Sequence, residues 1–200
     1  MDMIVFDFDD VLSQDNTEIV LEKFKDIISA NSFYSKLIAS KEFYECIMGH
    51  ISFSELKQKM STLNDIPIKD IEEIFRSMME SRTLNPKVLN IMNRIKEQGY
   101  KIALHSDYMK VPFDFWTRKF NLRDMFDILI CSAYVGTLKN NTETYDKVLK
   151  FLEKEPADLL YIDRRQGNIE TAKEKGIEGI VFKDSDSLLK ELEKKGIIIN

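Results

Sequence analysis

The fold of this chain is decided by the stretch Met3-Ile4-Val5-Phe6-Asp7-Phe8-Asp9-Asp10. Its first four residues are apolar, and the run ends abruptly in a cluster of acids. A short apolar run of this kind is typical of a strand buried on both faces, as in a parallel sheet. The acids are then predicted to lie in a loop at the carboxyl end of that strand. Functional groups of open parallel sheets collect at this edge, so the sequence predicts chemistry there.

Further apolar runs follow residue 84, and helical patterns separate them. The predicted strands are residues 102–104, 128–131, 159–162 and 180–182. Asn85 and Pro86 supply an N-cap and a proline at the first helical position, and Gly99 is placed to end that helix. Strands that alternate with helices imply right-handed crossovers and a mostly parallel sheet. The sequence therefore predicts an α/β fold with a Rossmann-like, doubly wound sheet.

The segment from about residue 17 to residue 81 has a different pattern, with helical periodicity and no convincing strand. One apolar stripe in it consists of Ile71, Ile74, Phe75, Met78 and Met79. Their spacing puts them on one face of a helix. We therefore expect an α/β core domain of residues 1–14 and 84–200 and an inserted α-helical cap domain of residues 15–83.

The composition excludes several classes of protein. The chain has 200 residues, with 29 lysines and arginines against 34 aspartates and glutamates, which gives a formal net charge of −5. An acidic chain without a basic block is not typical of a nucleic-acid binder. No run approaches the length of a membrane span, and residues 1–7 lack the features of a signal peptide, so a cytoplasmic location without a membrane partner is expected. Cys46 and Cys131 form no CxxC pair, which predicts two buried thiols.

Polar residues follow four of the predicted strands. They are Asp7 and Asp9, then Ser106 and Asp107, then Lys139, and finally Asp163. Because the carboxyl ends of parallel strands share one edge, these residues are expected to converge on one crevice. Two carboxylates spaced i and i+2 can act as nucleophile and general acid-base, or can share a hard cation such as Mg²⁺. A hydroxyl and an ammonium facing them would hold the oxygens of a transferring phosphoryl group. The alternative is that the acids after the first strand form only a solvated turn.

Four stretches carry a resemblance to a known family. They are Met3 to Leu12, Ile102 to Asp107, Gly136 to Asn140 and Tyr161 to Asn168. Together they resemble the motifs of the haloacid dehalogenase superfamily of phosphohydrolases, and the resemblance runs along the whole chain. The helical insert is similar to the small cap of that superfamily's first subclass. Gly49 to Ser52 and Ile95 to Gly99 resemble the branch that contains bacterial glucose-1-phosphate phosphatase and the N-terminal phosphatase domain of soluble epoxide hydrolase.

The resemblance implies a Mg²⁺-dependent phosphatase of a small phosphorylated metabolite, and it favours sugar phosphates as the substrates. Asp7 would attack phosphorus and become an aspartyl phosphate, while Asp9 would protonate the leaving alcohol and later deprotonate water. Mg²⁺ would bind a carboxylate oxygen of Asp7, the backbone carbonyl of Asp9 and the acid Asp163. The phosphate would be held by Ser106, Lys139 and the residue at position 107. Asp9 argues against haloacid dehalogenation, because those relatives lack an acid two residues after the nucleophile.

Two positions depart from the pattern of that branch. Arg164 stands where a second, metal-binding acid is usual, and Asp107 stands where a neutral Asn contacts phosphate. Exchanging an acid for arginine changes the charge by two units, and each unit at about 4 Å is worth roughly 4 kcal/mol at an effective dielectric near 20. Our hypothesis is that Arg164 pairs with Asp107, or with Asp7 or Asp9. The alternative is that Arg164 turns to solvent and Asp163 takes over the metal.

These departures leave a second function open, a catalytically degenerate relative with a binding or regulatory role. Other residues have two interpretations as well. His105 could be an acid or base, but a lone histidine that ends an apolar strand is more often packed and hydrogen-bonded. Phe43, Tyr44 and Met48 could line a substrate pocket, although their spacing favours the core of the helical insert.

Overall fold

A computed structural model describes residues 1–28 and 30–197 of the chain. Its main sheet has the strand order β5-β4-β1-β6-β7, and every neighbouring pair is parallel. The strands are β1 (Met3–Phe6), β4 (Lys101–Ser106), β5 (Ile128–Cys131), β6 (Leu159–Asp163) and β7 (Glu178–Val181). The sequence predicted all of these strands, and the α/β class with a doubly wound parallel sheet is confirmed.

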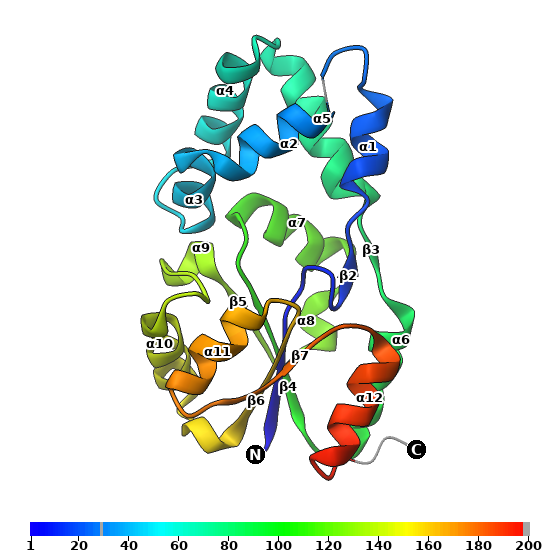
Figure 1. The fold of residues 1–200 in the computed structure, drawn as a ribbon, viewed down its shortest axis with the longest axis vertical. Helices are drawn as coiled ribbons and strands as arrows, with labels where there is room; N and C mark the ends of the chain where they lie inside the picture. Colours follow the sequence, from blue (N-terminus) through cyan, green and yellow to red (C-terminus); the bar gives the residue numbers. More distant parts are fainter. Residues whose placement is uncertain (29, 198–200) are drawn as a thin grey trace.

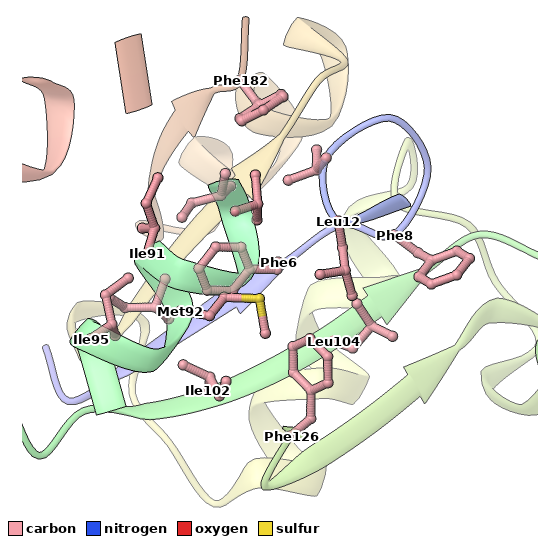
Figure 2. Close-up of a cluster of buried hydrophobic side chains, with 14 of the residues drawn as sticks. Phe6, Phe8, Leu12, Ile91, Met92, Ile95, Ile102, Leu104, Phe126 and Phe182 are labelled. Atoms are coloured by element: carbon pink, nitrogen blue, oxygen red, sulfur yellow. The ribbon is translucent and has the colours of Figure 1, made fainter. Parts of the chain in front are cut away.

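Helices cover both faces of this sheet (Figure 1). One face packs against α6 (Pro86–Glu97), α7 (Lys110–Lys119), α8 (Leu122–Met125) and α12 (Ser185–Lys194), and the other packs against α10 (Thr142–Leu152) and α11 (Gln166–Glu174). Ile4 and Phe6 point to the first face, while Met3 and Val5 point to the second. Successive side chains of a strand alternate between faces, so a run of four apolar residues fits a strand that is covered on both sides. Figure 2 shows the first cluster, with the α6 residues around Phe6.

In the part of the chain that the structure describes, the helical segment predicted between residues 17 and 81 forms five helices beyond the carboxyl edge of the sheet (Figure 1). They are α1 (Thr17–Lys23), α2 (Ala30–Ala39), α3 (Lys41–Ile47), α4 (Phe53–Asn64) and α5 (Ile68–Ser81). Their apolar faces meet in a cluster of their own, which includes Leu56, Met60, Ile71 and Ile74. Burial of a stripe on each helix against its neighbours is what stabilises short helices of this kind.

Two short strands connect the helices to the sheet. β2 (Ser13–Gln14) pairs antiparallel with β3 (Thr83–Leu84), and Asn85 donates its backbone N–H to the carbonyl of Leu12. A two-residue strand has no periodicity, so the sequence did not predict this pair. The domain boundaries expected next to residues 14 and 84 fall at these strands, and the division into two domains stays a prediction.

Local signals explain where the elements start and stop. The Asn85 side chain accepts hydrogen bonds from the backbone of Lys87 and Val88 and caps α6, as predicted. The connections α9 (Ser132–Val135) and η1 (Pro156–Asp158) are single turns.

Cys46 and Cys131 are buried free thiols, as predicted. None of the helices in the described part of the chain has the length and apolarity needed to cross a membrane.

Candidate active site

The loop after β1 fixes the first two acids. The backbone N–H of Asp7 donates to Ile162 of β6, and Oδ1 of Asp7 accepts the N–H of Phe8 at 2.8 Å. Both the backbone and the hydroxyl of Ser13 donate to the carbonyl of Phe8, which closes a tight turn over residues 8–13. Asp10 takes the left-handed conformation in this turn, with φ of 54°, which a short polar side chain tolerates better than most.

Lys139 joins the acids of two neighbouring strands. Its Nζ lies 2.7 Å from Oδ1 of Asp7, 2.7 Å from Oδ2 of Asp163 and 3.1 Å from the carbonyl oxygen of His105. The lysine side chain is only 2% exposed. Burial alone would lower the pKa of Lys139, but the charges of Asp7 and Asp163 outweigh it and raise the pKa. The ammonium is therefore the fixed cation at this edge of the sheet.

The same lysine leaves its two partners with different acidities. Burial raises the pKa of Asp7 to about 7, against the opposing charge of Lys139. Burial by itself would raise the pKa of Asp163 as well. Lys139, Asn168 and the backbone of Arg165 all donate hydrogen bonds to its carboxylate, however, and leave its pKa below the ordinary value. More donors stabilise the charged form of a carboxylate more strongly. Asp163 is thus the stronger acid of the two, and Asp7 the weaker.

The end of β4 contributes two of the predicted phosphate-binding residues. The Ser106 hydroxyl is buried and lacks a hydrogen-bond partner among the described residues. An orphaned buried hydroxyl is uncommon and is available to an incoming oxygen. The Asp107 carboxylate accepts the backbone N–H of Lys139 at 3.0 and 3.2 Å, and burial raises its pKa. Asp107 therefore holds the loop that carries Lys139.

His105 is part of the packing beneath the site. Its ring is fully buried, and Nδ1 lies 3.1 Å from the hydroxyl of Tyr161. Burial, reinforced by the charge of Lys139, lowers the pKa of His105 well below its ordinary value, so the ring is neutral. The prediction of a packed, hydrogen-bonded histidine is confirmed.

Asp9 has a partner that the sequence did not reveal. The guanidinium of Arg82 contacts the Asp9 carboxylate, donates to the Ser13 hydroxyl at 2.8 Å and lies 3.4 Å from Asp15. It also stacks over Trp116, 4.5 Å from the ring centroid. Arg82 directly follows α5, where the helical segment returns to the sheet. A lone arginine at such a junction belongs to no sequence motif, and its place beside the acid-rich loop exists only in the folded chain.

Arg164 has a different partner from those in our hypothesis. Its Nε lies 3.2 Å from Oδ2 of Asp10, and both side chains are 43% exposed. The hypothesis that Arg164 pairs with Asp107, Asp7 or Asp9 was wrong in its partner, because the left-handed turn at Asp10 brings that carboxylate towards the loop after β6. An ion pair this exposed contributes little to stability. Arg164 is therefore held at the rim, neither inside the acid cluster nor free in solvent.

The oxygens assigned to Mg²⁺ are largely engaged with the chain's own donors. Oδ1 of Asp163 accepts the N–H of Arg165 at 2.7 Å, and Oδ2 accepts Lys139 and Asn168 at 2.7 and 2.9 Å. In the part of the chain that the structure describes, no three His, Cys, Asp or Glu side chains are grouped to hold a metal. Mg²⁺ requires near-octahedral oxygen ligands. Because Asp7 and Asp163 both turn towards an ammonium, the donor set does not fit the predicted three-ligand site.

A cavity of about 240 Å³ lies between the helical segment and the loops of the sheet. Asp9, Asp107 and Asn168 line it from the sheet side. Asp107 contacts the backbone of Lys139 and Asn168 contacts Asp163, so the buried acids lie directly behind this lining. Phe43 and Tyr44 line the cavity from α3, although Phe43 also packs against the apolar cluster of the helices. The favoured interpretation of these two residues as core was therefore only partly right.

Comparison with known proteins agrees with this arrangement. Residues 4–182 match the family described as haloacid dehalogenase-like hydrolase. Bifunctional epoxide hydrolase 2 of Rattus norvegicus is 28% identical over 135 residues, which cover 62% of this chain and 23% of that protein. Flavin mononucleotide hydrolase 1 of Arabidopsis thaliana is 26% identical over 131 residues, which cover 66% of this chain and 53% of that protein. The chain thus spans about a quarter of the first relative and about half of the second.

The fold has close counterparts among solved structures. A haloacid dehalogenase family enzyme of Bacteroides thetaiotaomicron, in complex with magnesium and inorganic phosphate, superposes with a TM-score of 0.77 at 19% identity. The match covers 94% of this chain and 98% of that one. The family match over most of the chain, the parallel sheet and the acids at its carboxyl edge lead to one conclusion: the chain belongs to the haloacid dehalogenase-like hydrolase family.

Proposed function

We propose that this chain hydrolyses phosphate monoesters and that Asp7 is its nucleophile. The observation that carries the proposal is the buried Lys139 ammonium between Asp7 and Asp163, at the edge of the sheet where the orphaned Ser106 hydroxyl ends β4. Such an arrangement supplies a nucleophilic oxygen, a fixed positive charge and a hydroxyl donor for the phosphoryl oxygens. The Arabidopsis relative, a hydrolase of flavin mononucleotide, supports the same class of reaction, because flavin mononucleotide is a phosphate monoester.

The proposed reaction has two steps, each with a defined proton movement. In the first, an oxygen of Asp7 forms a bond to phosphorus, the ester P–O bond breaks, and Asp9 gives its proton to the departing alcohol. In the second, Asp9 takes a proton from water, the water oxygen attacks phosphorus, and the bond from phosphorus to Asp7 breaks. Lys139 and Ser106 would stabilise the phosphoryl oxygens throughout, as fixed donors do in other phosphoryl transfers.

We further propose that helices α1–α5 act as a cap over this chemistry. They form one wall of the cavity whose opposite side carries Asp9 and Asp107. A wall of this kind excludes bulk water from an aspartyl phosphate and selects among leaving groups. Arg82, which follows α5 and contacts Asp9, would set the orientation of the proposed general acid.

Mg²⁺ dependence stays a prediction. The magnesium and phosphate complex of the Bacteroides relative supports it. The hydrogen bonds around Asp163 argue against Mg²⁺ dependence, because that carboxylate already accepts hydrogen bonds from Lys139, Asn168 and Arg165. The same observation favours the second candidate function, a relative that binds a phosphorylated ligand without hydrolysing it.

The deciding experiment measures phosphate release from p-nitrophenyl phosphate, with millimolar Mg²⁺ and with a chelator, by the native chain and by Asp7→Asn. We expect turnover by the native chain and none by the variant. Asp26→Asn, an exposed residue of the helical segment, is the matched control and should behave like the native chain. Absence of turnover under both conditions would remove the proposed hydrolysis and leave the binding function.

A further inference from the structure

The wall of the cavity formed by the helical segment is apolar. Its lining side chains from α2, α3 and α5 include Leu37, Phe43, Ile47, Phe75, Met78 and Met79. Thr17 and the hydroxyls of Tyr34 and Tyr44 are the polar groups on this side, and no charged or amide side chain of α1–α5 in the described residues lines the cavity. Cavities lined by aromatic and thioether side chains bind apolar groups, and methionine adapts to their shape.

The charged lining side chains come from the sheet loops and from the two ends of the helical segment. They are Asp9, Asp10, Asp15, Arg82, Asp107, Arg164 and Arg165. The cavity therefore has a charged end next to the proposed phosphoryl site and an apolar end beneath the helices, and Met109, Pro112 and Trp116 extend the apolar lining towards the sheet. A ligand that matches both ends is a phosphate group attached to an apolar body.

Two aromatic side chains of this wall are only partly covered by the protein. Tyr34 is 40% exposed and Tyr44 is 47% exposed, although both line the cavity. Large apolar surface left open at a site is typical of a surface that a ligand covers. Tyr34 comes from α2 and Tyr44 from α3, so their apolar surface is presented by two separate helices.

We propose that this site takes phosphate monoesters of apolar alcohols, alkyl or aryl, in preference to sugar phosphates. The inference rests on the proposed function, since it names the leaving group of that reaction. Sugar hydroxyls placed against this wall would lose their hydrogen bonds to water without replacement, which is costly. Sites that select hydroxylated substrates present polar partners to them, and rejection is strong where such partners are missing. The apolar wall thus selects against the sugar phosphates that the family resemblance favours as substrates.

The test uses a homologous series of n-alkyl phosphates, from ethyl to hexyl, with glycerol 3-phosphate and glucose 1-phosphate as polar counterparts. We expect kcat/KM to rise about fourfold for each added methylene until the cavity is full, the ratio that corresponds to about 0.8 kcal/mol. The polar substrates should fall below hexyl phosphate. A flat or falling series, or faster turnover of the polar esters, would overturn the inference while leaving the hydrolysis in place.

A binding experiment separates this inference from the proposed reaction. A series of alkylphosphonates from methyl to hexyl, which cannot be hydrolysed, is titrated into the native chain by isothermal calorimetry. Affinity that rises with chain length, in a protein that turns over nothing, supports the apolar site and removes the hydrolysis. No turnover together with chain-length-independent binding removes both.

Variants locate the apolar end. Tyr44→Ser should lower the ratio of kcat/KM for hexyl phosphate over glycerol 3-phosphate by about tenfold, in the range measured for small apolar contacts in substrate pockets. Tyr44→Phe should keep the ratio, because only the hydroxyl is lost. Ile38→Ser is the matched control, since Ile38 lies on α2 with 41% exposure and does not line the cavity. An equal ratio in Tyr44→Ser and Ile38→Ser would contradict the assigned wall.

Discussion

Arg82 contacts Asp9 across 73 residues of sequence. Asp9 lies in the loop after β1, and Arg82 lies between α5 and β3, so the contact joins the acid loop to the end of the helical segment. The guanidinium is only 3% exposed and rests on the ring of Trp116. A planar guanidinium can bind a carboxylate and stack on an aromatic ring at the same time, which lysine does not reproduce.

The first prediction concerns this contact. Arg82→Lys should lower the free energy of unfolding by about 1–3 kcal/mol, because it removes hydrogen bonds to buried partners. It should also lower kcat by about 10- to 100-fold, since a misplaced Asp9 affects the proton transfer. Urea unfolding and steady-state kinetics measure both. Arg76→Lys, in an exposed ion pair on α5, is the control and should change neither quantity appreciably.

The second prediction concerns the two acids on Lys139, whose pKa values move in opposite directions. Burial raises the pKa of Asp7 to about 7, so at pH 8 its ionised form costs stability. Asp163 has a lowered pKa, so its ionised form adds stability. Asp7→Asn should therefore raise the free energy of unfolding at pH 8, and Asp163→Asn should lower it. Denaturant unfolding of both variants checks this, and shifts of the same sign would contradict the assigned acidities.

The third prediction concerns His105 and acid stability. The folded state keeps His105 neutral, while the unfolded state binds a proton as the pH falls through about 6.5. The unfolded state then holds more protons, so His105 makes stability fall with falling pH, by up to about 1.4 kcal/mol per pH unit. The native chain should therefore lose stability relative to His105→Asn between pH 7 and pH 5.

Comparing the two proteins at each pH removes the contributions of other groups, including the opposite one from Asp7. Parallel stability curves for the native chain and His105→Asn would show that the buried ring does not resist protonation.

The fourth prediction concerns the position of Arg164. Arg164→Asp removes the ion pair with Asp10 and adds a carboxylate next to Asp163. We expect the variant to bind Mg²⁺ about tenfold or more tightly than the native chain, the scale seen when groups around metal ligands are changed. Isothermal titration with MgCl₂ measures the two affinities. Arg165→Asp makes the same charge change one residue away, and an equal effect there would indicate general electrostatics and not a metal ligand.

Particular residues show how far the sequence alone could go. Asp7, Lys139 and Asp163 were expected at one edge of the sheet, and the structure places the Lys139 ammonium within hydrogen-bonding distance of both acids. This was predictable because each follows a strand of a parallel sheet, and the strands were marked by their apolar runs. The α/β class follows from the same alternation of strands and helices.

Other contacts depend on the positions that side chains take in the folded chain. Arg82 reaches Asp9 only because β2 and β3 pair and the ring of Trp116 supports its guanidinium. Arg164 reaches Asp10 and not the buried acids, because a left-handed turn moves Asp10 to the rim. Two-residue strands and single left-handed residues leave no periodic trace in a sequence.

The sequence by itself determined the strands of the sheet, the polar residues that follow them and the family to which the chain belongs. Only the tertiary structure decided which cation meets which acid, that Asp163 is held by three of the chain's own donors, and that an apolar wall faces the charged loops. The physical reason is that strand and helix formation follow from local periodicity, whereas charge pairing and pocket character depend on distances of a few ångströms between residues far apart in the chain.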